Sequence, residues 1–178
     1  MSKKRTIVKY TLIAVSTIFI MAIIAVSTIF STKQTRDLIV MGYVYTSTSK
    51  DLDLLHPTLK RKTLNMIAEA KKHNIDLRVI SGFRSMKDQD LLYSIGRGED
   101  YKKNVVTNAR AGKSYHNYGA AVDVVEYKNG FPNWSTKNWQ LIGKIGKTQG
   151  LVWGGDWKTF KDKPHFQLPK KYWADKLR

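Results

Sequence analysis

The chain contains no cysteine among its 178 residues. This absence excludes disulfide bonds, a thiolate nucleophile and a cysteine-ligated zinc site, so any bound metal must be held by His, Asp or Glu. Acidic residues are also scarce, because 14 Asp and Glu stand against 31 Lys and Arg, a formal net charge of +17. A charge of this size suits an anionic partner: nucleic acid, an acidic membrane surface or an acidic cell-wall polymer.

Internal repeats and low-complexity tracts are absent as well. A length of 178 residues and a hydrophobic content of 42% allow one well-buried core, so we expect one globular domain. Helical and strand patterns are mixed without regular alternation, which predicts an α+β fold. The patterns predict helices over 58–73, 85–95 and 137–149, strands over 77–80, 120–125, 151–157 and 165–168, and a long loop over 96–113.

Charge is missing altogether from residues 11–30, a run rich in Ile, Val, Ala and Phe. About 20 apolar residues match the thickness of a bilayer core. Residues 1–9 contain four cations and no acid, and the run does not end in the small-residue pattern of a cleavage site. We therefore expect a basic cytoplasmic N-terminus at 1–9 and an uncleaved transmembrane signal anchor at 10–30, with a cleaved signal peptide as the alternative.

The basic flank should remain in the cytoplasm, which would place the rest of the chain outside, on the cell-wall side of the membrane. Residues 31–50 are rich in Ser, Thr and Lys. We interpret them as a stalk with a short strand at 38–45, and residues 51–178 as the folded domain. An exported domain without a helix-turn-helix, zinc-finger or RNA-binding signature is not expected to bind nucleic acid.

One carboxylate lies inside an apolar run, since Asp123 follows Ala-Ala-Val and precedes Val-Val. An unpaired buried charge costs several kcal/mol or shifts its pKa until the group is neutral, so Asp123 must be compensated. Backbone amides or an arginine could do this, and so could a divalent metal shared with histidines. His116 is the nearest histidine, and Asn117-Tyr118-Gly119 offers a bend that lets Asp123 point back toward it.

A second segment, Asp162-Lys163-Pro164-His165, supplies another carboxylate and another histidine. Pro164 pushes the residue before it out of the helical region, so the segment forms a turn entering a strand. His116, Asp123 and His165 would leave a fourth zinc position open to water, which is the arrangement of catalytic zinc sites. Asp162 would stand beside them as a general base. The other two histidines are interpreted as structural.

The motif S-x-H-x-x-G-x-A-x-D at 114–123, followed by D-x-x-H at 162–165, resembles a family of zinc-dependent cell-wall peptidases. This family comprises the zinc D-Ala-D-Ala carboxypeptidases and the L-alanyl-D-glutamate endopeptidases, a VanY-like group. The S-G-F-R-S segment at 81–85 is similar to another family element, and the resemblance covers about residues 50–170. Segments 107–110 and 150–157 are most similar to the endopeptidase branch.

The resemblance implies a small mixed helix and antiparallel-sheet zinc peptidase domain of the Hedgehog/D-Ala-D-Ala-peptidase type, placed behind one N-terminal transmembrane helix. It implies Zn²⁺ as the cofactor, with His116, Asp123 and His165 as its ligands. Asp162 would be the catalytic acid and base. Arg84 would assist at the substrate carbonyl or carboxylate, and Ser114 would bind substrate with it. The alternative for Arg84 is a surface or structural ion pair.

The implied activity is hydrolysis of peptidoglycan stem peptides, with the L-Ala–D-Glu bond preferred. A D,D-carboxypeptidase that removes terminal D-Ala is the alternative within enzymes. A non-catalytic cell-wall-binding module on the same fold is the alternative in another class, and Asp162 argues against it because a module that only binds needs no base. We expect stem peptides and the membrane as partners, and a monomeric protein.

Overall fold

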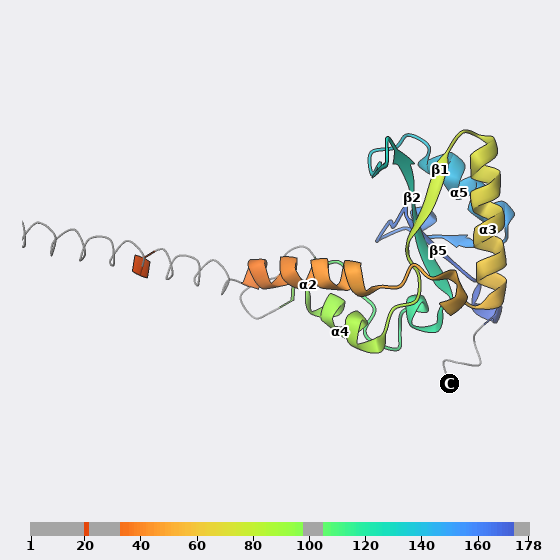
Figure 1. Ribbon diagram of the computed structural model, residues 1–178. Helices are drawn as coiled ribbons and strands as arrows, with labels where there is room; N and C mark the ends of the chain where they lie inside the picture. The colour runs from red at the N-terminus through yellow and green to blue at the C-terminus, as the bar shows by residue number, and fades with distance from the viewer. Residues whose placement is uncertain (1–19, 22–32, 98–104, 173–178) are drawn as a thin grey trace, which may run out of the picture.

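The computed structural model describes residues 20–21, 33–97 and 105–172 (Figure 1). The predicted N-terminus at 1–9 lies outside these residues, and so does the predicted anchor at 10–30 apart from two helical positions. Within the described ranges, no helix combines the length and the apolar character that a membrane span requires.

A single antiparallel sheet forms the centre of the domain, with strand order β1-β2-β5-β4 and with β3 paired to β2. The strands are β1 (Asp76–Ser81), β2 (Ala121–Lys128), β3 (Phe131–Pro132), β4 (Val152–Trp153) and β5 (His165–Gln167). The predicted α+β class is therefore confirmed. The strand expected at 151–157 is shorter than predicted, because Gly154 starts a 3₁₀ turn, η3 (Gly154–Asp156), directly after β4.

Two helices, α3 (Pro57–Lys72) and α5 (Trp139–Thr148), pack on one side of the sheet (Figure 1). Pro57 occupies the first turn of α3, where its missing N–H costs no hydrogen bond. The His56 side chain caps this helix by accepting a hydrogen bond of 3.2 Å from the Thr58 amide. His73 ends the same helix and pairs with Glu69. Both histidines are thus structural, as predicted.

The core lies between these helices and the sheet. Strand residues that point into the core determine which of their neighbours point to the opposite face of the sheet. Val122 of β2 and Phe166 of β5 are paired in register and fully buried. Phe166 contacts α5 so closely that a Cβ atom at Gly146 would overlap its ring. Side chains alternate along a strand, so the neighbours Asp123 and His165 point to the opposite face of the sheet. That face carries the candidate site.

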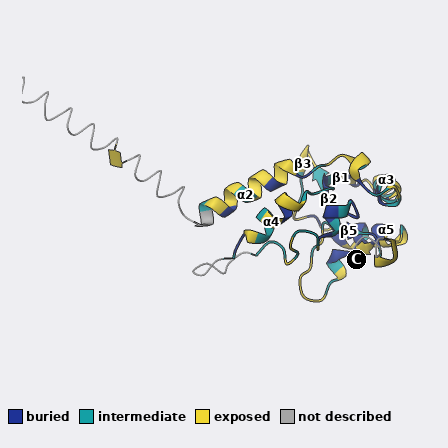
Figure 2. Ribbon diagram, turned by 90° about the horizontal axis from the view of Figure 1, so that it is seen from below, coloured by how far each residue is buried: buried dark blue, intermediate teal, exposed yellow. Residues whose placement is uncertain are grey.

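Helices α2 (Lys33–Ser47) and α4 (Met86–Ser94) lie side by side at one end of the sheet (Figures 1 and 2). The strand predicted at 38–45 is therefore wrong. Asp37 and Val44 are buried, with 7% and 2% of their surfaces exposed, and their spacing of seven residues is two helical turns. The contact with α4 outweighs the preference of this Val- and Tyr-rich segment for strand. Ser85 caps the start of α4, since its side chain accepts a hydrogen bond from the Asp88 amide.

A 3₁₀ turn, η2 (Tyr115–Tyr118), leads into β2 and ends at Gly119. Gly119 has a φ of +61°, and a Cβ atom placed there would lie 2.5 Å from the Leu54 backbone oxygen. Both the left-handed conformation and the close approach require glycine. This glycine supplies the bend that the sequence suggested between His116 and Asp123.

We expect Gly119→Ala to lower the free energy of unfolding by about 2–4 kcal/mol, because it combines backbone strain with a clash against backbone. Urea unfolding of the purified protein would measure this. Gly42→Ala is the matched control, since Gly42 lies in α2 with no atom within 4 Å of an added Cβ. The control should be neutral or stabilising by up to about 1 kcal/mol. Equal stability of the two variants would contradict the assigned strain.

Candidate metal centre

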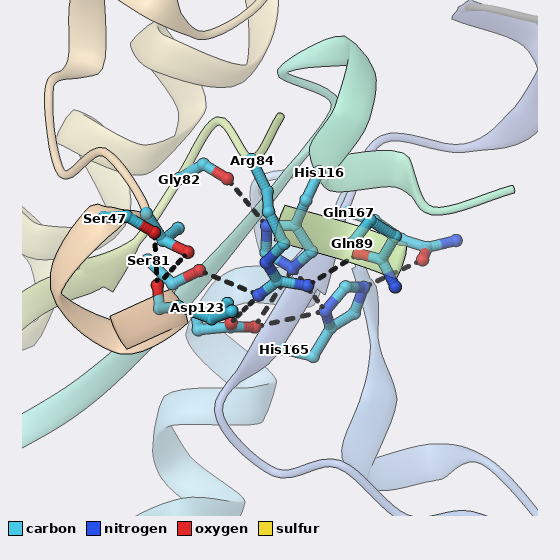
Figure 3. Close-up of polar contacts among 11 residues, drawn as sticks. Ser47, Ser81, Gly82, Arg84, Gln89, His116, Asp123, His165 and Gln167 are labelled. Atoms are coloured by element: carbon cyan, nitrogen blue, oxygen red, sulfur yellow. Dashed lines mark hydrogen bonds and ion pairs between the residues drawn. The ribbon is translucent and has the colours of Figure 1, made fainter. Parts of the chain in front are cut away.

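The three predicted ligands come together at the sheet face opposite α3 and α5 (Figure 3). His116 is supplied by η2, Asp123 by β2 and His165 by β5. Asp123 is the register partner of His165 on one side and of Ser81 on the other. Ser81, Asp123 and His165 therefore form one row across three strands.

The ligand atoms form a nearly equilateral triangle. Nε2 of His116 lies 3.3 Å from Nδ1 of His165 and 3.4 Å from Oδ1 of Asp123. Nδ1 of His165 lies 3.2 Å from the same Asp123 oxygen. Zinc bonds of about 2.0–2.1 Å at tetrahedral angles place ligand atoms about 3.3 Å apart. The donor types and their spacing therefore fit a zinc ion.

The remaining nitrogen of each imidazole faces a carbonyl oxygen. Nδ1 of His116 lies 2.7 Å from the Gly82 backbone oxygen, and Nε2 of His165 lies 2.9 Å from Oε1 of Gln167. A carbonyl oxygen only accepts, so these nitrogens carry the hydrogens and donate. The lone pairs of the other two nitrogens then point at the space beside Asp123. Such outer hydrogen bonds orient histidine ligands in metal sites.

The electrostatics of the triangle favour ligands in the deprotonated state at two of its three positions. Burial lowers the pKa of His116 despite the nearby Asp123 charge, so its imidazole is neutral. Burial opposes ionisation of Asp123, but its contacts with His116 and His165 hold its pKa well below the usual range. Burial also disfavours the charged form of His165, yet the carboxylates of Asp123 and Asp162 raise its pKa. A proton on His165 would compete with a metal ion.

Asp162 lies beside the triangle, in the turn before β5. Its backbone amide donates a hydrogen bond of 3.0 Å to the Gly154 backbone oxygen. Its backbone oxygen accepts a hydrogen bond of 3.3 Å from the His165 backbone amide. Burial and then the charge of Asp123 raise the pKa of Asp162 to about 6, against the opposing effects of His165 and Arg84. A general base is most effective when its pKa is close to the working pH. Asp162 is therefore suited to proton transfer near neutrality.

In the metal-free protein we expect the Asp162 carboxyl to titrate near pH 6, where other carboxyls are already ionised. The signal can be followed by ¹³C NMR of labelled Asp and assigned with Asp162→Asn. Asp76 is an internal control, because its hydrogen bond with Arg78 lowers its pKa. Added zinc should move the Asp162 transition to lower pH, since a nearby cation favours the carboxylate. A transition below pH 4, like that of Asp76, would contradict the assigned desolvation.

Arg84 extends from the S-G-F-R-S segment toward the triangle, with only 11% of its side chain exposed. Its guanidinium donates to Oε1 of Gln89 over 2.9 Å and to Oγ of Ser81 over 3.2 Å, and lies 3.8 Å from Asp123 (Figure 3). Its buried Nε has no hydrogen-bond partner among the described residues. Arg84 is thus an ion-pair partner of Asp123 and also a cation at the site.

An open cleft of about 440 Å³ gives access to these groups. Arg84, Ser114, Asp162 and the three triangle residues all line it, so the cleft collects every site residue named from the sequence. Ser114 precedes η2, and its side chain makes no capping hydrogen bond to that turn. Its position on the cleft wall is compatible with contact to a substrate.

Sequence reasoning assigned no role to Gln89 and Gln167, which support the site. Gln89 is fully buried and joins Arg84 to the cleft wall, because its Nε2 donates to the Ala109 oxygen over 2.7 Å. Gln167 orients His165, and Trp157 lies against the same imidazole with ring centroids 5.1 Å apart. The alternation of β5 does place Gln167 on the face of His165, which was the available signal.

Comparison with known proteins places this architecture in a family. A family model described as VanY, D-alanyl-D-alanine carboxypeptidase, matches residues 52–154. The chain is 43% identical over 124 residues to the peptidoglycan L-alanyl-D-glutamate endopeptidase CwlK of Bacillus subtilis (strain 168), an alignment covering 64% of this chain and 73% of that protein.

Two solved structures have a similar fold. The Serratia marcescens L-Ala D-Glu endopeptidase ChiX superimposes with a TM-score of 0.51 and 28% identity, over 72% of this chain and 91% of that chain. A vancomycin-resistance D,D-pentapeptidase VanY variant in complex with Zn(II) superimposes with a TM-score of 0.54 and 17% identity, over 69% of this chain and 77% of that chain. The second likeness concerns the fold alone. Because the family model spans more than half of the sequence and a relative shares 43% of aligned residues, this chain belongs to the VanY family of peptidases.

Proposed function

We propose that this chain is a zinc-dependent peptidase that hydrolyses peptidoglycan stem peptides at the L-Ala–D-Glu bond. The observation that carries the proposal is the triangle of His116, Asp123 and His165, whose ligand atoms lie 3.2–3.4 Å apart in an open cleft beside Asp162. These three residues would hold the ion. The choice of bond is supported by the similarity to CwlK and ChiX, both endopeptidases for that linkage.

Zinc at this position would supply Lewis-acid chemistry, which acidifies water and polarises a carbonyl group. The Asp162 carboxylate takes the proton of the attacking water and passes it to the nitrogen of the leaving amine. Burial of Asp162 raises its pKa in the metal-free protein, which favours a carboxylate that both accepts and returns a proton. The Arg84 guanidinium places positive charge where the carbonyl oxygen becomes negative. Ser114, on the cleft wall, contacts the substrate.

The net charge of +17 suits this substrate, because stem peptides are anionic. We further propose that residues 10–30 anchor the chain in the cell membrane as a single span, with the peptidase domain on the cell-wall side and acting as a monomer. The uncharged run at 11–30 and the four cations before it support this placement.

A D,D-carboxypeptidase is the second candidate, favoured by the description of the matched family model. A buried cation such as Arg84 close to the triangle could also bind the terminal carboxylate of such a substrate. The two activities differ in product, since one separates L-Ala from the rest of the stem and the other removes one D-Ala.

Mass spectrometry of a digest of purified pentapeptide muropeptides tests the choice. We expect a fragment that ends in L-Ala together with a free peptide that begins at D-Glu. Loss of a single D-Ala from intact stems would instead establish the carboxypeptidase. Binding of peptidoglycan without either product would favour a binding module. A parallel digest with Asp162→Asn shows which products depend on the proposed base.

A further inference from the structure

Much of helix α2 is exposed at the outside of the molecule (Figure 2). Several of its exposed side chains are large and apolar. We define the outer face of α2 by Leu38, Ile39, Tyr43 and Tyr45, which are 60%, 52%, 49% and 43% exposed. Leu38 and Tyr45 are seven residues apart and Ile39 and Tyr43 are four apart, so each pair lies along one line of the helix. All four side chains lie on the same half of the helix. Large apolar side chains gathered on one exposed helix face mark an interaction surface.

The opposite side of α2 is fixed to the domain. Val44 is buried toward α4, and the buried Asp37 carboxylate accepts a hydrogen bond of 3.0 Å from the Gly96 amide. Turning α2 about its axis would expose Val44 and break this hydrogen bond. The outer face therefore cannot bury itself against its own domain.

Two cations lie beside the outer face. The acid of α2, Asp37, faces inward, whereas Arg36 is exposed and the Lys50 ammonium lies 5.3 Å from the centre of the Tyr45 ring. Tyrosines beside aliphatic side chains and cations are the composition of segments at the membrane–water interface. Cations there also attract anionic lipid headgroups.

The position of α2 in the chain selects a bilayer as the occupant. The uncharged run ends at residue 30, and α2 begins at Lys33, so Ser31 and Thr32 alone separate them. Two residues extend by at most about 7 Å, which keeps the start of α2 at headgroup depth when the run spans the membrane. A second copy is a poorer fit, because four partly exposed side chains offer far less than the ~800 Å² per partner of a stable interface.

We propose that the outer face of α2 lies in the headgroup region of the bilayer and seats the peptidase domain directly on the membrane surface. The inference rests on the proposed membrane anchor at 10–30. The domain would then be held against the membrane in one orientation, and residues 31–50 would not act as a flexible stalk.

Spin labelling of the full chain in lipid vesicles tests this, and the absence of native cysteine makes each label unique. Single cysteines at Leu38, Ile39 and Tyr43 would be labelled in protein reconstituted into vesicles of equal parts phosphatidylethanolamine and phosphatidylglycerol. Leu64→Cys is the matched control, an exposed leucine on α3. Relative to the control, we expect severalfold fewer collisions with an aqueous nickel chelate and more with oxygen at all three outer-face positions.

Three results would overturn the inference. Collision rates at the outer face equal to those at Leu64 would mean that α2 stays in water. Dipolar broadening between labels on the outer face would mean that a second copy covers it. Failure of the unlabelled chain to float with the vesicles would overturn the anchor together with this inference. The muropeptide digest is independent of all three, so the peptidase proposal would stand or fall separately.

Discussion

Asp162→Asn is expected to slow stem-peptide hydrolysis by at least about 10²–10⁴-fold, the usual contribution of a general acid–base residue. The amide keeps the shape of the carboxyl group but cannot accept the proton of the attacking water. The three ligand positions are unchanged, so the zinc content should equal that of the wild-type protein. Product release from muropeptides and elemental analysis of the same samples would measure both quantities.

In the metal-free protein the same substitution should not destabilise the fold at neutral pH. The pKa of Asp162 is raised in the folded state to about 6 from 3.8, so this group favours folding when protonated. That contribution is complete below the unfolded pKa and is lost as the pH rises through about 6. Asn is neutral throughout, and the variant should therefore melt at the wild-type temperature or above it at pH 7.

Asp76→Asn serves as the matched control, because Asp76 is exposed, pairs with Arg78 and does not line the cleft. It should hydrolyse stem peptides at the wild-type rate. If Asp162→Asn retained most of the activity, Asp162 would not be the base. A loss of zinc in that variant would instead assign Asp162 to the metal.

Loss of zinc and of all measurable activity is the result expected for His116→Ala. Removing one corner of the triangle leaves two ligands, one of which, His165, has a raised pKa and binds protons in competition with metal. His73→Ala is the control, since His73 is exposed at the end of α3 and pairs only weakly with Glu69, at 3.8 Å. Elemental analysis after dialysis should find zinc in the control and none in His116→Ala.

Chelation of the wild-type protein should have a parallel effect. Metal that binds only the folded state adds about 4 kcal/mol of stability at a thousandfold excess over its dissociation constant, so its removal should lower the melting temperature. Added zinc should restore both melting temperature and hydrolysis. A chelated sample that keeps full activity, or a His116→Ala protein that keeps its zinc, would refute the metal assignment.

The parts of the fold that follow local patterns could be predicted from the sequence. Leu59, Thr63, Met66 and Ala70 repeat at helical spacing and are all buried in α3. The capping Ser85 and the left-handed Gly150 mark the ends of α4 and α5 by local hydrogen bonding. Helix α2 could not be predicted in this way. Its buried face is set by contact with α4 and Gly96, which lie far along the chain.

The ligand and base positions could likewise be singled out, because Asp123 in an apolar run and the motifs around His116 and His165 are visible in the sequence. The supports around them are not local. Gly82 contributes only a backbone oxygen, and Gln89 meets Arg84 through the packing of α4. A register shift in the pairing of β1 with β2, between Val79 and Ser81, aligns Ser81 with Asp123. Such a bulge re-aims side chains without leaving a sequence signature.

Ser81, Asp123 and His165 form a row across β1, β2 and β5, so metal binding depends on the register in which these strands pair. A slip of one residue between β2 and β5 would turn either Asp123 or His165 to the face where Val122 and Phe166 now pack. Chains folded with such a slip would hold no ligand triangle. Because the ion would bind only chains with the correct register, it would stabilise that strand pairing relative to a slipped one. The metal would thus contribute to folding as well as to catalysis.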